Sequence, residues 1–171
     1  MSKLKLINRL KRTYAMERSH AFITFPAIAV YVLFTNSPID VVFLLYGLAL
    51  CIFILFQGQH YFKLKLHSLK GVTIDQKSNL LFFKKSKILN LLFISLIPFV
   101  FILQIFLNNW TVKTNNLNYW AIAVNVFGIL EHINYYYRQL MIDNSSDLNY
   151  IFRNRKLKVA SLSKDLLENK I

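Results

Sequence analysis

The sequence predicts an all-α integral membrane protein, a bundle of four transmembrane helices with both termini in the cytoplasm. Hydrophobic residues make up 55% of the 171 positions and gather in four long runs. The 21 Lys and Arg residues outnumber the 8 Asp and Glu residues, giving a net charge of +13, and they lie almost entirely outside those runs. A disordered polycation would lack the apolar runs. A single cysteine excludes a disulfide scaffold and any multi-cysteine metal site.

Residues 1–19 predict a basic amphipathic helix that lies in the membrane interface. Leu4, Ile7, Leu10 and Tyr14 recur at near-helical spacing among basic residues. This pattern is typical of helices that bury one apolar face at the headgroup boundary and leave the charged face in water.

Residues 20–142 contain the four predicted spans, at about 20–36, 39–60, 87–108 and 118–140. A helix needs roughly 20 residues to cross a bilayer, and the first two runs reach that length only by including polar residues at their ends. Between them, Ser37 stands in the position of a helix cap and Pro38 at the first helical position, which predicts a tight antiparallel hairpin. A cleaved signal peptide is the alternative for the first run, but no small-residue cleavage site follows it.

The distribution of positive charge predicts the orientation. All but one of the 21 basic residues fall before the first span, between the second and third spans, or at and beyond the end of the fourth, and only Lys113 falls on the other side. This asymmetry follows the positive-inside rule and places both termini in the cytoplasm. Trp110 and Trp120 fall at the outer edge, where an aromatic belt is expected.

Two basic segments complete the predicted cytoplasmic face. In the loop 61–86, a helical stripe continues from the second span and is expected to end at Gly71. The tail 143–171 is expected to contain two short helices, one over 147–157 and one that begins at Ser161 or Ser163.

Glu131 is the polar residue that most needs an explanation, because it is the only acid inside the four predicted spans apart from Asp40, which stands at the capped start of the second. An ionisable group at membrane depth must be neutralised, paired with a cation or bound to a metal. The residues predicted to lie with it at the cytoplasmic end of the bundle are His132, His60, His20, Arg18, Gln57, Tyr135 and Arg138.

Two interpretations of this polar cluster remain open. In the first, which the sequence favours, Glu131 pairs with Arg18 or His60 and fixes the register of the helices. In the second, His20, His60, His132 and Glu131 bind a metal ion or transfer protons. No two of these residues have the spacing of a known ligand motif, and four scattered histidines exclude a resemblance to the His-box di-iron hydroxylases. A haem between His60 and His132 has no other support, so no cofactor is predicted and the catalytic residues, if any, are unknown.

Two further groups of polar residues have predicted roles. Gln104 and Asn125 are expected at similar depths in the third and fourth spans, where they would hydrogen-bond across the helices. Basic residues near a membrane surface attract anionic lipid by about 1 kcal/mol each. Those predicted to bind lipid or another anion are Lys63, Lys65, Lys84, Lys85, Arg153, Arg155 and Lys156. Aromatic residues interleaved with them could stack on a single nucleic-acid strand, but no RNA-binding fold is recognisable, so this partner is disfavoured.

The sequence favours a small non-enzymatic protein of the bacterial inner (cytoplasmic) membrane that acts as an accessory, regulatory or oligomeric effector subunit through its basic face. It lacks a catalytic motif, and four short helices enclose little of a transport path, so we expect a homo-oligomer or a subunit of a larger complex. The first alternative is a small membrane enzyme or a metal- or haem-binding protein that uses Glu131 and the histidines. The second is a proton-coupled conductance through an oligomer that uses Glu131.

Overall fold

The computed structural model describes residues 3–111, 116–142 and 145–171, and the predicted all-α class is confirmed for them. Its one β-type pairing within these ranges is an isolated bridge between Arg138 and Val159. Lys113, the single basic residue predicted on the outer side, lies outside the described residues. The elements in chain order are α1 (Lys3–Ser19), η1 (His20–Thr24), α2 (Phe25–Thr35), α3 (Pro38–Leu69), α4 (Gln76–Leu107), α5 (Asn116–Tyr136), α6 (Ser145–Asn154) and α7 (Ser161–Glu168).

The first three elements form one continuous helix from Lys3 to Thr35, with a widened π turn in its middle. Pro26 has no N–H and cannot donate to the carbonyl four residues back. The N–H of Phe25 instead reaches the carbonyl of His20, five residues back, and the turn widens to accommodate the proline. The amphipathic segment and the first apolar run therefore share one helix axis.

The central helix α3 begins and ends where the sequence indicates. Ser37 is its N-cap residue and Pro38 its first residue, although the Ser37 hydroxyl makes no capping hydrogen bond. At the other end, Gly71 has a φ of 75°, a left-handed conformation that glycine adopts without strain. The N–H groups of Gly71 and Val72 bond to the carbonyls of Ser68 and His67, which closes the helix in a Schellman motif.

Three helices are long and apolar enough to cross a membrane: Lys3–Thr35, α3 and α4. The fourth predicted span corresponds to α5, which ends at Tyr136 and is not among the three, because Asn125, Glu131 and His132 interrupt its apolar run. The helices α3 and α4 each have 32 residues, or about 48 Å at ~1.5 Å per residue. Each therefore exceeds a hydrocarbon core of ~30 Å by several turns.

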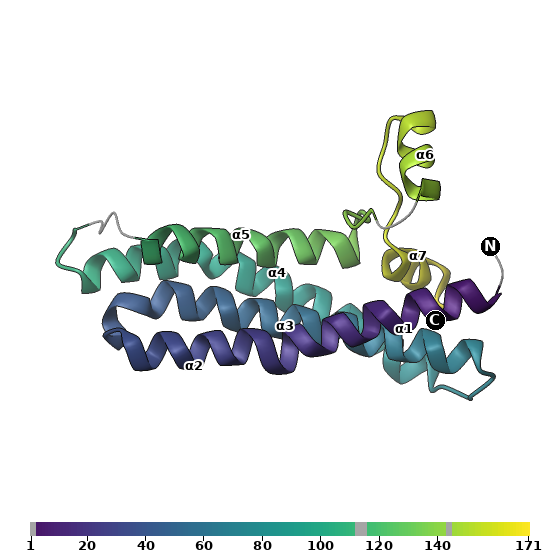
Figure 1. The fold of residues 1–171 in the computed structure, drawn as a ribbon, viewed down its shortest axis with the longest axis horizontal. Coiled ribbons are helices and arrows are strands. Elements are labelled where there is room, and N and C mark those ends of the chain that lie inside the picture. Colours follow the sequence, from purple (N-terminus) through teal and green to yellow (C-terminus); the bar gives the residue numbers. More distant parts are fainter. Residues whose placement is uncertain (1–2, 112–115, 143–144) are drawn as a thin grey trace.

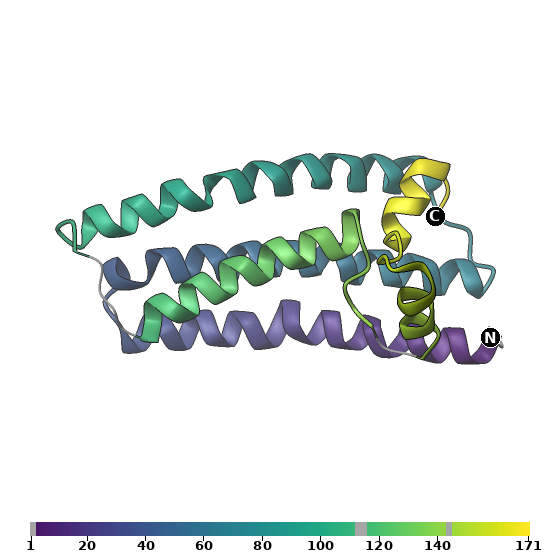
Figure 2. The ribbon, with the colours of Figure 1, turned by 90° about the horizontal axis from the view of Figure 1, so that it is seen from above.

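Helix α3 lies at the centre of the bundle. Seen from above, it runs between α4 on one side and the α1–α2 helix on the other, and α5 crosses it obliquely (Figure 2). Half of its apolar stretch is buried, against 11% for α4 and for the first helix. Much of α2 and α4 is exposed and apolar, including Phe34, Ile88 and Phe99, on a scale that monomeric water-soluble proteins rarely show.

The N-terminus, the α3–α4 turn and the C-terminus all lie at one end of the bundle, and the α2–α3 and α4–α5 connections lie at the other (Figures 1 and 2). We call the first the basic end; it comprises the start of α1, residues 61–86 and residues 145–171. Helix α7 packs against α4 and α5 there, and α6 projects away from the long helices (Figure 1).

Candidate functional site

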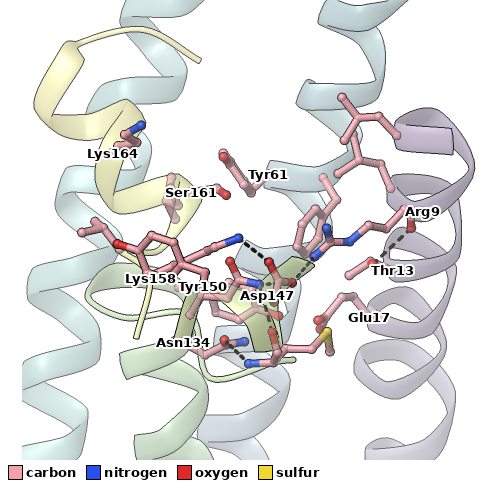
Figure 3. Close-up of a pocket in the computed structure, with 18 residues that line it drawn as sticks. Arg9, Thr13, Glu17, Tyr61, Asn134, Asp147, Tyr150, Lys158, Ser161 and Lys164 are labelled. Atoms are coloured by element: carbon pink, nitrogen blue, oxygen red, sulfur yellow. Dashed lines mark hydrogen bonds and ion pairs between the residues drawn. The ribbon is translucent and has the colours of Figure 1, made fainter. Parts of the chain in front are cut away.

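A cavity of about 560 Å³ opens at the basic end between α1, α3, α5 and the C-terminal segment (Figure 3). Its wall on α1 consists of residues one helical turn apart, with Arg9, Thr13 and Glu17 in line and Leu6 and Leu10 beside them. The other walls contain Tyr61, Phe62, Asn134, Tyr135, Gln139, Met141, Asp147, Tyr150, Lys158, Val159, Ser161, Leu162 and Lys164. Both apolar and charged side chains therefore face the same space.

The inner part of the cavity is acidic. Glu17 points into it from α1 (Figure 3) and is 5% exposed, and Tyr135 of α5 is 4% exposed. The Tyr135 hydroxyl interacts with the carboxyl groups of both Glu17 and Glu131. Glu17 Oε2 and the Tyr135 hydroxyl oxygen nevertheless make no hydrogen bond of good geometry. Glu131 accepts a long hydrogen bond of 3.4 Å from the side chain of Asn134.

Gly58 of α3 makes room for this group. A Cβ atom at position 58 would lie 2.4 Å from both Cζ and the hydroxyl oxygen of Tyr135. Because real Cβ atoms do not approach other atoms so closely, the Tyr135 ring can lie beside Glu17 only if residue 58 is a glycine.

The outer part of the cavity is organised by Asp147 of α6. Its carboxylate forms ion pairs with Arg9 Nη2 at 3.2 Å and Lys158 Nζ at 2.6 Å, and Gln139 donates to it at 3.1 Å (Figure 3). The ammonium group of Lys158 also lies 5.0 Å from the centroid of the Tyr150 ring. These contacts tie the first helix to the C-terminal segment across 138 positions of sequence.

A second polar cluster is buried in the bundle between α3, α4 and α5. Gln57 and Asn90 exchange two amide hydrogen bonds of 2.9 Å, and Tyr136 donates to Gln57 Oε1 at 2.7 Å. Asn90 Nδ2 lies 3.3 Å from His132 Nδ1, whereas His132 Nε2 has no partner. Because Gln57 and Asn90 are fully buried, this cluster fixes the register of three helices.

The candidate residues from the sequence occupy several separate places. Glu131 and Tyr135 lie together, and Gln57 and His132 belong to the second cluster. His60 Nε2 bonds to Asn79 Oδ1 at 2.8 Å, and its ring packs against two phenylalanines.

The other three candidates, His20, Arg18 and Arg138, have exposed side chains. Among the described residues, no ion pair joins Glu131 to Arg18 or His60. In that same part of the chain, no group of three or more His, Cys, Asp or Glu side chains could hold a metal ion.

Gln104 and Asn125 both bind the backbone of α3 instead of each other. Gln104 accepts from the N–H of Phe43 at 3.1 Å and donates to the carbonyl of Ile39, and Asn125 donates to the carbonyl of Phe43 at 3.0 Å. Both side chains therefore reach one point on the central helix, the backbone of Phe43. Gly47 allows this approach, because a Cβ there would lie 2.6 Å from Asn125 Nδ2.

The predicted anion-binding residues all lie at the basic end. Lys65 forms a 2.6 Å ion pair with Asp165, and Lys84 donates to the side chain of Asn169 at 2.9 Å. The remaining five have exposed side chains: Lys63, Lys85, Arg153, Arg155 and Lys156.

Sequence reasoning missed Glu17 and Asp147 as members of a site. Glu17 falls in a segment dominated by basic residues, where a single acid suggests an intrahelical pair with no further role. The spacing of Arg9, Thr13 and Glu17 at every fourth position was the available signal, because it puts them on one face of a helix. No comparable signal exists for Asp147, whose partners are distant in sequence.

Comparison with protein-family models, with curated proteins and with solved structures finds no match to this chain.

Proposed function

We propose that this chain is a four-span protein of the bacterial cytoplasmic membrane, with both termini inside, and that it acts non-enzymatically as an accessory or oligomeric effector subunit. The observation that carries the proposal is the convergence of three basic segments, far apart in sequence, at one end of the bundle (Figures 1 and 2). Polar contacts between α3, α4 and the C-terminal residues hold them there, including those of Lys65 with Asp165 and of Gln76 with Ile171.

The way α5 is buried supports its role as the fourth span. Its polar residues Asn125 and His132 face the other helices and are 2% exposed. The residues that it exposes between positions 121 and 136, among them Ile122, Val126 and Leu130, are apolar and suited to lipid. A helix whose polar groups are covered by neighbouring helices can cross a bilayer despite a modest overall hydropathy.

The non-enzymatic role is preferred to a metal or haem centre because the histidines are held by separate contacts. The Nε2 atom of His60 hydrogen-bonds to Asn79, and the side chain of His20 is exposed. The exposed cations Arg153, Arg155 and Lys156 are instead free to attract anionic lipid or an acidic partner surface, at about 1 kcal/mol each near a membrane.

The mass of the native complex tests this proposal. The full chain is extracted in mild detergent, and native mass spectrometry measures its stoichiometry and any co-purifying protein. We expect several copies of the chain or a stoichiometric partner. Replacing Arg153, Arg155 and Lys156 with glutamine should release a partner that binds the basic end. A strict monomer without partners contradicts the effector role.

A further inference from the structure

The cavity at the basic end has opposite charges at its two levels. Its inner level holds the carboxyl group of Glu17, with that of Glu131 behind it across Tyr135. Its outer level holds Arg9, Lys158 and Lys164 against the single acid Asp147, so it carries net positive charge. At about 560 Å³, the cavity is within the usual size range of small-molecule sites.

The inner level offers hydrogen-bonding groups that the protein itself does not satisfy. Glu17 Oε2 and the Tyr135 hydroxyl oxygen are buried and make no hydrogen bond of good geometry, although the hydroxyl lies near both carboxyl groups, and neither Glu17 nor Glu131 forms an ion pair with a described residue. A buried carboxylate without a partner is strongly unfavourable. An ammonium group with several N–H donors would neutralise this charge and could bond to both Glu17 and Tyr135.

We propose that this cavity binds a phosphoethanolamine group, with its ammonium end at Glu17 and Tyr135 and its phosphate toward Arg9 and Lys158. The order of charges in the ligand is complementary to that in the cavity: its phosphate faces the positive outer level, and its ammonium group faces the acidic inner level. Apolar side chains such as Leu6, Leu10 and Phe62 would contact the methylene groups of the ligand and any attached chains.

Two sources could supply this group: the headgroup of phosphatidylethanolamine or a free phosphoethanolamine compound. The lipid source rests on the proposed membrane orientation, in which Glu17 lies close to the start of the first apolar run and therefore near the cytoplasmic headgroups. The groups at the inner level also determine which headgroup the cavity selects. A choline headgroup has no N–H donor for Glu17 Oε2, and a glycerol headgroup has no cation.

Lipid retention in native mass spectrometry tests the proposal. The full chain is incubated with equimolar dioleoyl phosphatidylethanolamine, phosphatidylcholine and phosphatidylglycerol, and the bound lipid is measured. We expect the wild type to retain phosphatidylethanolamine about tenfold over phosphatidylcholine, the gain from one charge-assisted hydrogen bond. Glu17→Gln should abolish this preference, and Tyr135→Phe should reduce it about threefold. Glu168→Gln, at an exposed acid of α7, should keep it.

Free glycerophosphoethanolamine provides the second arm. If free glycerophosphoethanolamine displaces the retained lipid, the lipid headgroup occupies the cavity. If the free compound binds to lipid-free protein, a soluble compound can also supply the phosphoethanolamine group. Equal retention of phosphatidylethanolamine and phosphatidylcholine, without binding of the free compound, overturns the proposal. The comparison between lipids uses the wild type, so it holds even if a variant fails to fold.

The outcomes for this site and for the effector role are distinguishable. A monomer that prefers phosphatidylethanolamine would refute the effector role and leave this site intact. An oligomer without that preference would refute this site and leave the effector role intact.

Discussion

Asp165 on α7 accepts a 2.7 Å hydrogen bond from the hydroxyl of Tyr61 on α3, 104 positions earlier in the sequence. Its carboxylate also pairs with Lys65, one turn further along α3, at 2.6 Å. Leu162 and Ile171, on either side of Asp165, are buried in the same core cluster as Tyr61. The end of the chain is therefore an integral part of the bundle and closes one side of the cavity.

We predict that Asp165→Asn loosens the docking of α7. The substitution removes the charge that Tyr61 and Lys65 bind, and hydrogen bonds to charged groups contribute about 1.5–3 kcal/mol. Amide hydrogen exchange in α7 should accelerate by about tenfold or more, as mass spectrometry of peptides from 161–171 would show. Glu168→Gln, on the same short helix but exposed, is the matched control and should leave exchange unchanged. Equal protection in both variants would contradict the docking role of Asp165.

We predict that Gly58→Ala displaces Tyr135 and destabilises the bundle. A Cβ at position 58 would lie 2.4 Å from the Tyr135 ring, and such overpacking costs about 1–3 kcal/mol. Gly128→Ala on α5 is the control, because its Cβ would meet the flexible end of Leu50 at 3.1 Å. Both changes gain the same helix propensity, so the difference between them isolates the clash. Thermal unfolding in detergent should rank Gly58→Ala below Gly128→Ala, and equal stability would contradict the predicted clash.

The sequence was sufficient to predict the all-helical class and some of the helix ends, because those depend on local signals. The Ser37–Pro38 start of α3 and its end before Gly71 follow from capping chemistry alone. The apolar run of α4 follows from hydropathy, but its start at Gln76 was not predicted, because the prediction placed residues 61–86 in a loop. Asp75 caps this start by accepting from the N–H of Ser78.

The candidate site could be predicted only in part, because its contacts join segments that are distant in sequence. Glu131 stood out as an acid in an apolar run, yet nothing local indicated that Tyr135 would bring Glu17 to the same place. Gln104 and Asn125 were expected at similar depths, but depth cannot show that each binds the α3 backbone at Phe43. Which polar groups meet depends on helix rotation and packing, which a single sequence does not specify.

We predict that the buried amide pair Gln57–Asn90 stabilises the bundle as a unit. Asn90→Leu removes both amide hydrogen bonds between Asn90 and Gln57, leaving Gln57 only its bonds to Phe53 and Tyr136, and it also removes the polar neighbour of His132 Nδ1. This should cost about 2–3 kcal/mol in the free energy of unfolding. Adding Gln57→Leu removes the amide that has already lost its two bonds to Asn90, so the double variant should be less destabilised than the sum of the single ones by about 1 kcal/mol or more. Thermal unfolding of the four proteins gives this coupling energy.

Ser95→Ala on the exposed side of α4 is the control for that series. Its hydroxyl bonds only to the carbonyl of Leu92, so stability should change by less than about 0.5 kcal/mol. Strict additivity of Gln57→Leu and Asn90→Leu would show that the two amides contribute independently and would contradict the predicted unit.

We predict that single engineered cysteines will report four membrane crossings. The background is Cys51→Ala, since Cys51 is the one native cysteine and is fully buried. Trp110 and Phe152 are 70% and 78% exposed and lie on either side of α5. If α5 crosses the bilayer, Trp110→Cys should react with a membrane-impermeant maleimide on intact cells, and Phe152→Cys should react only after permeabilisation.

Thr73→Cys, in the exposed α3–α4 turn, should follow Phe152→Cys, and Ser37→Cys, in the α2–α3 turn, should follow Trp110→Cys. Labelling after permeabilisation and denaturation gives the total reactive cysteine for each variant and excludes differences in expression. Reaction of both Phe152→Cys and Trp110→Cys in intact cells would place both ends of α5 outside. In that case only three helices cross the membrane, the C-terminal segment lies opposite the α3–α4 turn, and the basic end could not form as the structure has it.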